Sequence, residues 1–348
     1  MQFQQNVPLA PLTTFQIGGP ARWFAEAASE EDIAHAVEFA ERRGLRLLVL
    51  GGGSNLLVSD AGFPGLILRI ALKGIVRRDG PAGAAEFSVA AGEAWDGFVA
   101  HAVAEGCAGV ECLSGIPGSA GATPVQNVGA YGQEVSQTIL RVRVYDRTQS
   151  RFLELPAAEC GFAYRRSIFN STLRERYIVS RVDFALRPDG APMLAYAELR
   201  RHFAAGEGRP GLREVREAVR SIRAGKGMLI VEGDPDSRSA GSFFKNPVVP
   251  EEKLDRIAQA WDVSRDSIPH YPAGPGRVKL PAAWLVEQAG FHKGYALGAA
   301  GISSRHALAL VNRGGATASE VAALRDCIVE AVERRFGVVL EPEPVWVA

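Results

Sequence analysis

Residues 115–132 read GIPGSAGATPVQNVGAYG, a stretch without a single charged residue. It belongs to a longer segment, residues 106–134, that is rich in Gly, Ala, Pro and Ser. Connections of this length inside a compact domain are usually functional rather than spacers. The side chains of Ser119, Gln126 and Asn127 can hydrogen-bond a phosphate or the edge of a heterocycle. The stretch therefore predicts a binding loop.

A second glycine-rich stretch, GGGSN at residues 51–55, follows the apolar segment LRLLVL. Glycines at the end of a strand let successive N–H groups converge on an anion, because no Cβ blocks the approach. The same triplet also suits a tight turn, and the residues alone leave both interpretations open. Neither stretch has the spacing G-x-G-x-x-G or G-x-x-x-x-G-K-[ST]. A nucleotide could still bind, but through the loops of another fold.

The segments around these loops show both helical and strand periodicity. Residues 29–44 predict a helix, with Ser29 and Asp32 as a capping box and Gly44 at its end. The segments LRLLVL, GLILRI, ILRVRVYD, RFLEL and YIVSRVDFAL have the apolar runs or alternation of strands. The pattern predicts an α+β or α/β module, followed by a break in composition at residues 187–192.

The second half of the chain is richer in helices. Residues 212–227, a segment from about Pro250, and residues 281–290 are predicted to be helical, and the longest helix is expected at residues 317–337, with Thr317 and Glu320 as a capping box. HALALVN predicts a strand, and VVLEPEPVWVA predicts a last strand interrupted by two prolines.

Composition narrows the possible functions. The chain has 348 residues, which predicts two or three domains, and 39 basic residues balance 39 acidic ones. This balance argues against a general role on nucleic acid or a membrane surface, since both need a basic excess. Four cysteines without zinc spacing predict reduced thiols and no metal site. The sequence shows neither a signal peptide nor an apolar run of the roughly 20 residues that span a bilayer, so we expect a cytoplasmic protein.

Three short segments carry candidate chemistry. Ser242 in AGSFFKNP could be a nucleophile, a proton donor or a hydroxyl that closes a turn, and it lacks the G-x-S-x-G pattern of hydrolases. Arg165 in YRRS is a candidate anion ligand, because guanidinium matches carboxylate and phosphate. Glu341 and Glu343 lie two apart, so on an extended chain they face one side. Apolar neighbours, among them Trp346, predict that this region is enclosed.

Taken together, these segments are more diagnostic of a protein family than any one of them alone. GGGSN, IPGSAGATPVQNVGAYG, FAYRRSIF, AGSFFKNP, KLPAAWLVEQAG and LEPE occur in this order over nearly the whole chain. The combination resembles the UDP-N-acetylenolpyruvoylglucosamine reductase family, in the subgroup with a tyrosine loop. The resemblance implies an α+β flavoprotein of peptidoglycan precursor synthesis. Its FAD-binding domain would be of the p-cresol methylhydroxylase type, with two α+β subdomains, and a C-terminal α+β domain would bind the substrate.

The resemblance also implies where the parts lie. The FAD domain would cover residues 1–200, with a core of about 17–188 split near residue 72. The substrate domain would cover residues 201–348, and its last strand would return to the active site. NADPH would reduce non-covalently bound FAD, which would then reduce the UDP-sugar to UDP-N-acetylmuramate. We expect a monomer that binds no nucleic acid and does not insert into a membrane.

Site residues follow from the same resemblance. Catalytic positions are Arg165, Ser242 and Glu343, and the substrate contacts are Tyr164, Tyr196, Lys226, Asn246 and His306. The FAD contacts are Gly51, Gly52, Gly53, Ser54, Asn55, Ile116, Pro117, Gly118, Ser119, Gly121, Ala122, Gln126, Asn127, Gly129, Ala130, Tyr131 and Gly132.

These residue types suit the reaction. Hydride addition to an enolpyruvyl alkene leaves a strongly basic carbanion, so a hydroxyl such as that of Ser242 can protonate it. Arg165, and Glu343 if it carries a proton, could stabilise the charge on the neighbouring carboxylate. Two alternatives are another FAD-dependent oxidoreductase of the same fold and a non-catalytic protein that binds a nucleotide sugar.

Overall fold

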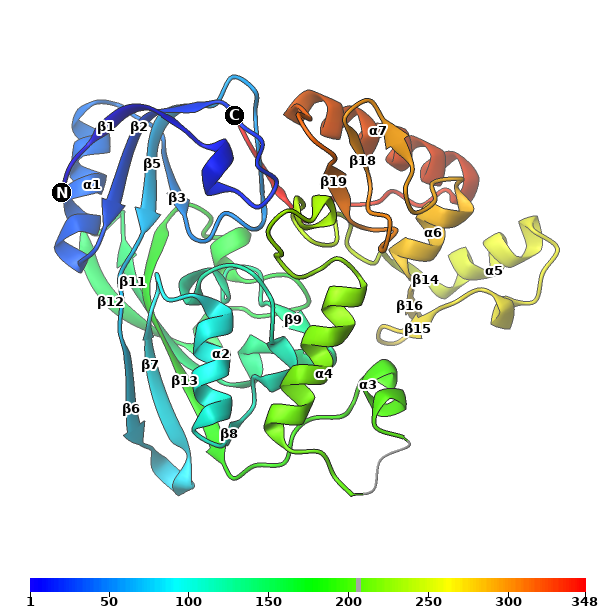
Figure 1. Ribbon diagram of the computed structural model, residues 1–348, viewed down its shortest axis with the longest axis horizontal. Coiled ribbons are helices and arrows are strands. Elements are labelled where there is room, and N and C mark those ends of the chain that lie inside the picture. The colour runs from blue at the N-terminus through cyan, green and yellow to red at the C-terminus, as the bar shows by residue number, and fades with distance from the viewer. Residues whose placement is uncertain (205–207) are drawn as a thin grey trace. The chain divides into compact units, whose positions relative to one another are not determined.

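The computed structural model describes residues 1–204 and 208–348. The chain forms two compact units. The first unit contains residues 1–8, 20–53 and 63–229, and the second contains residues 9–19, 54–62 and 230–348. Figure 1 traces the chain from its blue N-terminus to its red C-terminus.

A four-stranded sheet opens the first unit, in the order β1-β2-β5-β3. Its strands are β1 (Gln4–Pro8), β2 (Pro20–Ala27), β5 (Phe63–Ile70) and β3 (Leu47–Leu50). β1 is antiparallel to β2, whereas β2, β5 and β3 run parallel. Helix α1 (Glu30–Arg42) connects β2 to β3, and the capping box of Ser29 and Asp32 is present as the sequence predicted.

The second sheet of this unit has the strand order β12-β11-β13-β7-β6, and β8 pairs with β13. Its strands are β6 (Ile75–Asp79), β7 (Ala85–Ala90), β8 (Cys107–Ala108), β11 (Ile139–Asp146), β12 (Arg151–Pro156) and β13 (Tyr177–Pro188). All of its pairs are antiparallel. The unit also contains the short pair β9 (Gly129–Ala130) and β10 (Gln133–Glu134) and the helices α2 (Trp95–Ala104), α3 (Ala197–His202) and α4 (Leu212–Gly225).

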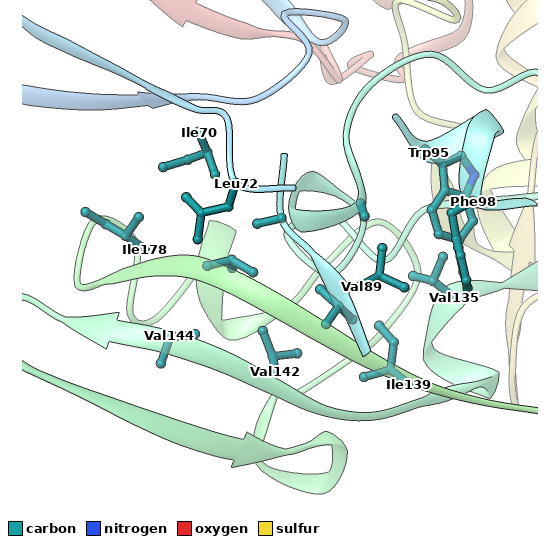
Figure 2. Close-up of a cluster of buried hydrophobic side chains, with 14 of the residues drawn as sticks. Ile70, Leu72, Val89, Trp95, Phe98, Val135, Ile139, Val142, Val144 and Ile178 are labelled. Carbon is teal, nitrogen blue, oxygen red and sulfur yellow. The ribbon is translucent and has the colours of Figure 1, made fainter. Parts of the chain in front are cut away.

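One hydrophobic core joins the two large sheets, α1 and α2, and a smaller cluster contains Leu199 of α3 and Val215 of α4. Figure 2 shows part of the core, with Trp95 and Phe98 from α2, Val89 from β7, and Val142 and Val144 from β11. The indole N–H of Trp95 donates to the carbonyl of Leu113, at 3.0 Å. This bond fixes the chain just before the glycine-rich stretch 115–132.

Helix α4 belongs to the first unit, whose last residue is Leu229. The boundary at residue 200 expected for the FAD domain stays a prediction. α4 lies beside α2, as Figure 1 shows. Arg216 and Arg220 of α4 both bind the carboxylate of Asp96 on α2, at 2.5 Å. These contacts explain why α4 stays with the first unit. Which half binds FAD and which binds substrate stays a prediction.

The second unit is built from separated segments. Its strands are β4 (Leu56–Val58), β14 (Val248–Pro250), β15 (Tyr271–Pro272), β16 (Arg277–Lys279), β17 (Ala296–Leu297), β18 (Ala300–Ile302), β19 (Leu310–Asn312) and β20 (Val345–Val347). They form the sheets β14-β16-β15, β17-β18-β19 and β20-β4. Its helices are α5 (Glu251–Ala260), α6 (Ala282–Gln288) and α7 (Ala318–Phe336).

The N-terminal segment of this unit is held by its own core. Phe15 is fully buried, and its ring centre lies 6.3 Å from that of Phe243. The side-chain amide of Asn312 donates to the carbonyl of Phe15, at 3.0 Å. The predicted capping box of Thr317 and Glu320 begins α7, and Gly337 ends it with a φ of 59°.

Two strand predictions were too long. In HALALVN only Leu310–Asn312 forms a strand, because the N–H of Ala309 turns back to the carbonyl of His306. In VVLEPEPVWVA only Val345–Val347 forms a strand, which pairs in parallel with β4. The prolines at 342 and 344 lack the N–H that a ladder needs.

Candidate functional site

The two predicted glycine loops meet in the first unit. A Cβ on Gly52 would lie 2.5 Å from the Cα of Gly118, and one on Gly51 would lie 2.7 Å from the hydroxyl oxygen of Ser119. Gly53 and Gly118 have φ angles of 65° and 123°, which side-chain-bearing residues rarely adopt. The two backbones thus approach as closely as glycine permits. Such paired loops expose N–H groups that can hold the phosphates of a dinucleotide.

The second loop is fixed by backbone hydrogen bonds to the turn before α2. The N–H of Trp95 donates to the carbonyl of Gly118, and the N–H of Ala120 donates to that of Glu93. Gly121 packs on Ala91 so closely that an added Cβ would lie 2.4 Å from the Ala91 Cβ. Gly121 is therefore required for packing, whatever the loop binds.

Predicted FAD contacts in this loop differ in exposure. Asn127 is buried, and its amide group donates to Glu134 at 2.8 Å and to the carbonyl of Ala163 at 3.1 Å, while its oxygen accepts the N–H of Ser136. These bonds give Asn127 a structural role. The other predicted contacts in this unit that are half-buried or exposed are Gly51, Gly52, Ile116, Pro117, Gly118, Ala122, Gln126, Gly129, Ala130, Tyr131 and Gly132.

Arg165 occupies a tight turn in the first unit. Ala163 and Arg166 exchange two backbone hydrogen bonds of 2.9 and 3.0 Å, and Arg165 has a left-handed φ of 54°. Its guanidinium donates to the carbonyl of Gly129 at 2.7 Å, and the side-chain amide of Asn170 donates to the carbonyl of Arg165 at 3.2 Å. A left-handed non-glycine residue costs of the order of 1 kcal/mol, and such residues cluster at functional sites. The turn therefore links Arg165 to the predicted binding loop.

The aromatic end of this loop gathers three predicted residues. The rings of Tyr131 and Tyr196 meet edge to face with their centres 5.4 Å apart, and the Lys226 ammonium lies 6.0 Å from the Tyr131 ring centre. Lys226 also binds Glu198, at 2.5 Å. Burial raises the pKa of Tyr131 to about 12, so its phenol is protonated at neutral pH. The cluster offers an aromatic face, a cation and hydroxyl donors.

Sequence reasoning missed two buried charged residues that support this loop. Arg223 donates to the carbonyls of Gly115 and Met228, and its guanidinium bonds the Tyr131 hydroxyl. Glu111 is fully buried and accepts hydrogen bonds from Gly109, Gln133 and Met193. Glu111 was detectable as a lone carboxylate in an otherwise apolar segment.

In the second unit, Ser242 and Glu343 are brought together. The N–H of Glu343 donates to the carbonyl of Phe243 at 2.8 Å, and the N–H of Lys245 donates to that of Glu341 at 3.0 Å. Phe243 and Phe244 are each 2% exposed, as expected of core anchors. Ser242 is half-buried and follows Gly241, which has a φ of 74°. The residue after the serine is thus bonded through its backbone to the Glu343 segment.

The predicted enclosure around LEPE is only partial. Glu343 is half-buried, but Glu341 is exposed and pairs with Lys245 at 3.3 Å, and Trp346 is 43% exposed. The segment pairs with residues 243–245 through one isolated antiparallel bridge, between Phe244 and Pro342. That both glutamates face one side stays a prediction. The two carboxylates therefore have different surroundings.

The remaining predicted residues of this unit are Ser54, Asn55, Asn246 and His306. The Asn55 amide donates to the carbonyl of Glu343 at 3.3 Å, which joins the GGGSN segment to the Glu343 segment. Asn246 accepts the N–H of Ala282 and so caps α6 through its oxygen. His306 accepts the N–H of Leu308 at Nδ1, at 3.0 Å. Since Nδ1 is an acceptor, neutral His306 carries its ring proton on Nε2.

All four cysteines are free thiols. Burial raises the pKa of Cys160 to about 12, so this thiol is unreactive. Among residues 1–204 and 208–348, His, Cys, Asp and Glu form no group that could hold a metal ion. Within the same ranges, no helix has the length and apolar character needed to cross a membrane.

Comparison with known proteins covers the whole chain. Residues 21–154 match an FAD binding domain, and residues 234–347 match the C-terminal domain of UDP-N-acetylenolpyruvoylglucosamine reductase. The chain is 48% identical over 350 residues to UDP-N-acetylenolpyruvoylglucosamine reductase from Thermobifida fusca, covering 99% of this chain and 98% of that one. It is also 48% identical over 355 residues to the reductase of Streptomyces coelicolor, covering 100% and 91%.

A solved structure agrees. UDP-N-acetylenolpyruvylglucosamine reductase from Thermus caldophilus matches with a TM-score of 0.67 at 26% identity, covering 100% of this chain and 98% of that one. The fold class predicted from the sequence, an FAD-binding domain with a C-terminal α+β domain, is confirmed.

Proposed function

Because the chain belongs to the UDP-N-acetylenolpyruvoylglucosamine reductase family, we propose that it reduces UDP-N-acetyl-3-O-(1-carboxyvinyl)-glucosamine to UDP-N-acetylmuramate. It is an FAD-dependent oxidoreductase of peptidoglycan precursor synthesis, with NADPH as the reductant. The observation that carries this conclusion is the 48% identity over 99% of the chain. The enzyme class, the overall reaction and the use of FAD and NADPH predicted from the sequence are confirmed.

The glycine loops fit FAD. A side chain on Gly51 or Gly52 would collide with the second loop, so only glycine allows the two loops to approach this closely. We assign the binding of FAD to residues 51–55 and 116–132. When bound, FAD supplies the two-electron relay between NADPH and the alkene. GGGSN contains no histidine, and we propose that FAD is held without a covalent bond.

Ser242 is proposed to give the proton. Once hydride has been added to the terminal alkene carbon, negative charge remains on the carbon next to the substrate carboxylate. That carbanion is a strong base, and a hydroxyl held in place can protonate it. The support is the rigid setting of Ser242, whose neighbour Phe243 is buried and bonded at both its N–H and its carbonyl. No general base is needed, because the serine acts as an acid.

Arg165 and Glu343 are proposed to stabilise the charge on the substrate carboxylate. The left-handed turn and the bond to Gly129 hold the guanidinium of Arg165 before substrate arrives, so reorganisation costs little. Glu343 in its protonated form would donate a second hydrogen bond. Loss of one such donor typically lowers turnover by about 100- to 1,000-fold.

Substrate contacts are proposed for Tyr164, Tyr196, Lys226, Asn246 and His306. Lys226 supplies a cation for the diphosphate, beside the exposed ring of Tyr196. His306 offers the Nε2–H that its Nδ1 bond dictates. Asn246 uses its oxygen to cap α6, so its amide N–H₂ would face the sugar. We further propose a cytoplasmic monomer, which size-exclusion chromatography with light scattering tests.

The experiment separates the two half-reactions of a Ser242→Ala variant. Stopped-flow absorbance follows bleaching of the flavin by NADPH, and then its reoxidation by the enolpyruvyl sugar. Bleaching should be unchanged, whereas reoxidation should slow by about 10²- to 10⁴-fold, because the proton donor is gone. Ser319→Ala, in the same unit at the start of α7, is the matched control and should match the wild type in both steps.

Three outcomes would contradict this proposal. Equal loss in both half-reactions would mean that Ser242 is structural. If the sugar fails to reoxidise the reduced wild-type flavin, the chain is another FAD-dependent oxidoreductase, and a protein without a bleachable flavin would be a non-catalytic binder.

A further inference from the structure

A buried carboxylate holds two loops of the second unit together. Asp236 lies in the 3₁₀ turn Pro235–Ser237 and is 6% exposed. One of its oxygens accepts hydrogen bonds from the Ser304 hydroxyl at 2.7 Å and from Arg305 Nε at 2.9 Å, and the other accepts the Ser304 N–H at 3.1 Å. Arg305 also binds Asp234. Residues 234–236 and 303–305 are thus joined by a charged, nearly saturated cluster.

The carboxylate of Asp236 is ionised in this cluster. Burial by itself would raise its pKa, but hydrogen bonds from Ser304, Arg305 and Ser303 outweigh burial and hold the pKa below its usual range. Asp234 and Asp236 face the single guanidinium of Arg305. A charge held by several hydrogen bonds in a buried place is costly to disturb, since each lost partner leaves a buried polar group unsatisfied.

Both loops lead directly to the residues proposed for chemistry. In the second loop, the Ser303 hydroxyl accepts the N–H groups of Arg305 and His306, at 3.1 and 3.2 Å. The N–H of Leu308 then bonds His306 Nδ1, and the carbonyl of Leu308 accepts the N–H of Phe243 at 2.7 Å. A continuous set of hydrogen bonds therefore runs from Asp236 to the peptide that follows Ser242.

The first loop closes this set into a ring. From Asp236 the chain continues through Ser239, whose hydroxyl accepts the N–H of Gly241 at 3.3 Å, to Ser242. The buried rings of Phe243 and Phe244 anchor this segment in the core. Hydrophobic packing by itself does not fix the orientation of the neighbouring Ser242 backbone. The hydrogen-bonded ring is what fixes the direction of the Ser242 backbone relative to the His306 turn.

We propose that Asp236, acting with Arg305, is a positioning residue for the proton-transfer step, because it locks the loop that carries Ser242 to the loop that carries His306. The inference rests on the proposed function, in which Ser242 gives the proton. Misplacement of a reacting group by 1 Å can cost about 100-fold in rate, so a lock distant from the reacting atoms can matter as much as a direct contact.

The test uses Asp236→Asn in the FAD-loaded enzyme. The amide keeps the shape but loses the charge and turns one acceptor into a donor, which opposes Arg305. Reoxidation of the flavin by saturating enolpyruvyl sugar should slow, by up to about 100-fold. The solvent deuterium isotope effect on that step should rise above the wild-type value, since proton transfer becomes limiting. Flavin bleaching by NADPH and the affinity for UDP should stay within about twofold of the wild type.

Glu320→Gln is the matched control. Its carboxylate also lies in the second unit and accepts N–H groups, from Thr317 and Ala299, and a hydroxyl, from Thr317. It is bonded to neither loop, so the same acid-to-amide change should lower the melting temperature without altering either half-reaction. Arg305→Lys keeps the charge and should retain more activity than Arg305→Met, which would show that the ion pair matters.

Several results would overturn the inference. A positioning role is contradicted if the flavin of Asp236→Asn is reoxidised at the wild-type rate, if both half-reactions are lost equally, or if the isotope effect is unchanged. Should this variant fail to fold, the same measurements on Arg305→Lys decide the matter, because slowed reoxidation with normal bleaching is expected there too. Failure of the wild-type enzyme to turn over the sugar would instead refute the proposed function.

Discussion

Gly52→Ala tests the contact between the two glycine loops. The new Cβ would lie 2.5 Å from Gly118 Cα and 2.9 Å from Gly118 C, whereas carbon atoms prefer separations of about 3.5–4.0 Å. Both neighbours are backbone atoms, so the loops must move apart by about 1 Å. Overpacking of this kind typically costs about 1–3 kcal/mol. If FAD needs the closed loops, its affinity should fall by about 5- to 150-fold.

Gly52 is exposed, so the loops can separate in the apoprotein without disturbing the core. The melting temperature of the apoprotein should therefore change little, and the loss should appear in FAD binding. Quenching of flavin fluorescence, titrated with apoprotein, measures the dissociation constant, and thermal unfolding with and without FAD reports the same loss independently.

Gly97→Ala is the control within the same unit. Its Cβ would lie 3.7 Å from the Ala94 Cβ, an ordinary contact inside α2. Replacing a helical glycine should raise stability by about 0.4–1 kcal/mol and leave FAD affinity unaltered. Wild-type affinity in Gly52→Ala would refute the argument that these loops form the FAD cradle.

Two further predictions concern ionisable groups. Hydrogen bonds from Arg176 and Thr148 hold the pKa of Asp146 well below its usual range, so Asp146 adds stability above its unfolded pKa of about 3.9 and loses it as the pH falls through the folded value. Asp146→Asn should lower the melting temperature at pH 7 and flatten its fall in acid; an unchanged acid profile contradicts this. Burial raises the pKa of Tyr131 to about 12, whereas an exposed tyrosine has a pKa of about 10. Between these two pH values Tyr131 should therefore stay protonated while an exposed tyrosine is ionised. Ultraviolet difference titration of the wild type against Tyr131→Phe measures this pKa. Arg223→Met should raise the pKa of Tyr131 further, because Arg223 lowers it. A pKa of Tyr131 equal to that of an exposed tyrosine would show that the cluster is open to water.

Local signals predicted the helices well. Ser29 with Asp32 and Thr317 with Glu320 are capping boxes written within four residues, and both begin helices as expected. The alternation of apolar and polar residues, which is also a local signal, correctly predicted strands β11, β12 and β13. The membership of residues 9–19 and 54–62 in the second unit was not predictable, because it depends on partners such as Asn312 and Val345 that lie far along the chain.

The residues of the candidate site were likewise predictable only in part. Glycines and the AGSFFKNP segment stand out by residue type, and their order along the chain gave the resemblance. Arg223 and Asp236 did not stand out, since an arginine on a charged helix and an aspartate in GDPDS look like solvated residues. Only the structure shows them buried with distant partners.

The parallel pair of β4 and β20 can form only late in the synthesis of the chain. Asn55 and Glu343, which are bonded beside this pair, are 288 residues apart in the chain. At about 5–20 residues per second, a ribosome needs about 15–60 s between the two. Throughout that interval Leu56–Val58 lacks β20, the strand that it pairs with, and stays open to non-native contacts. A fusion or truncation that disturbs Val345–Val347 would prolong this exposure and lower the yield of folded enzyme.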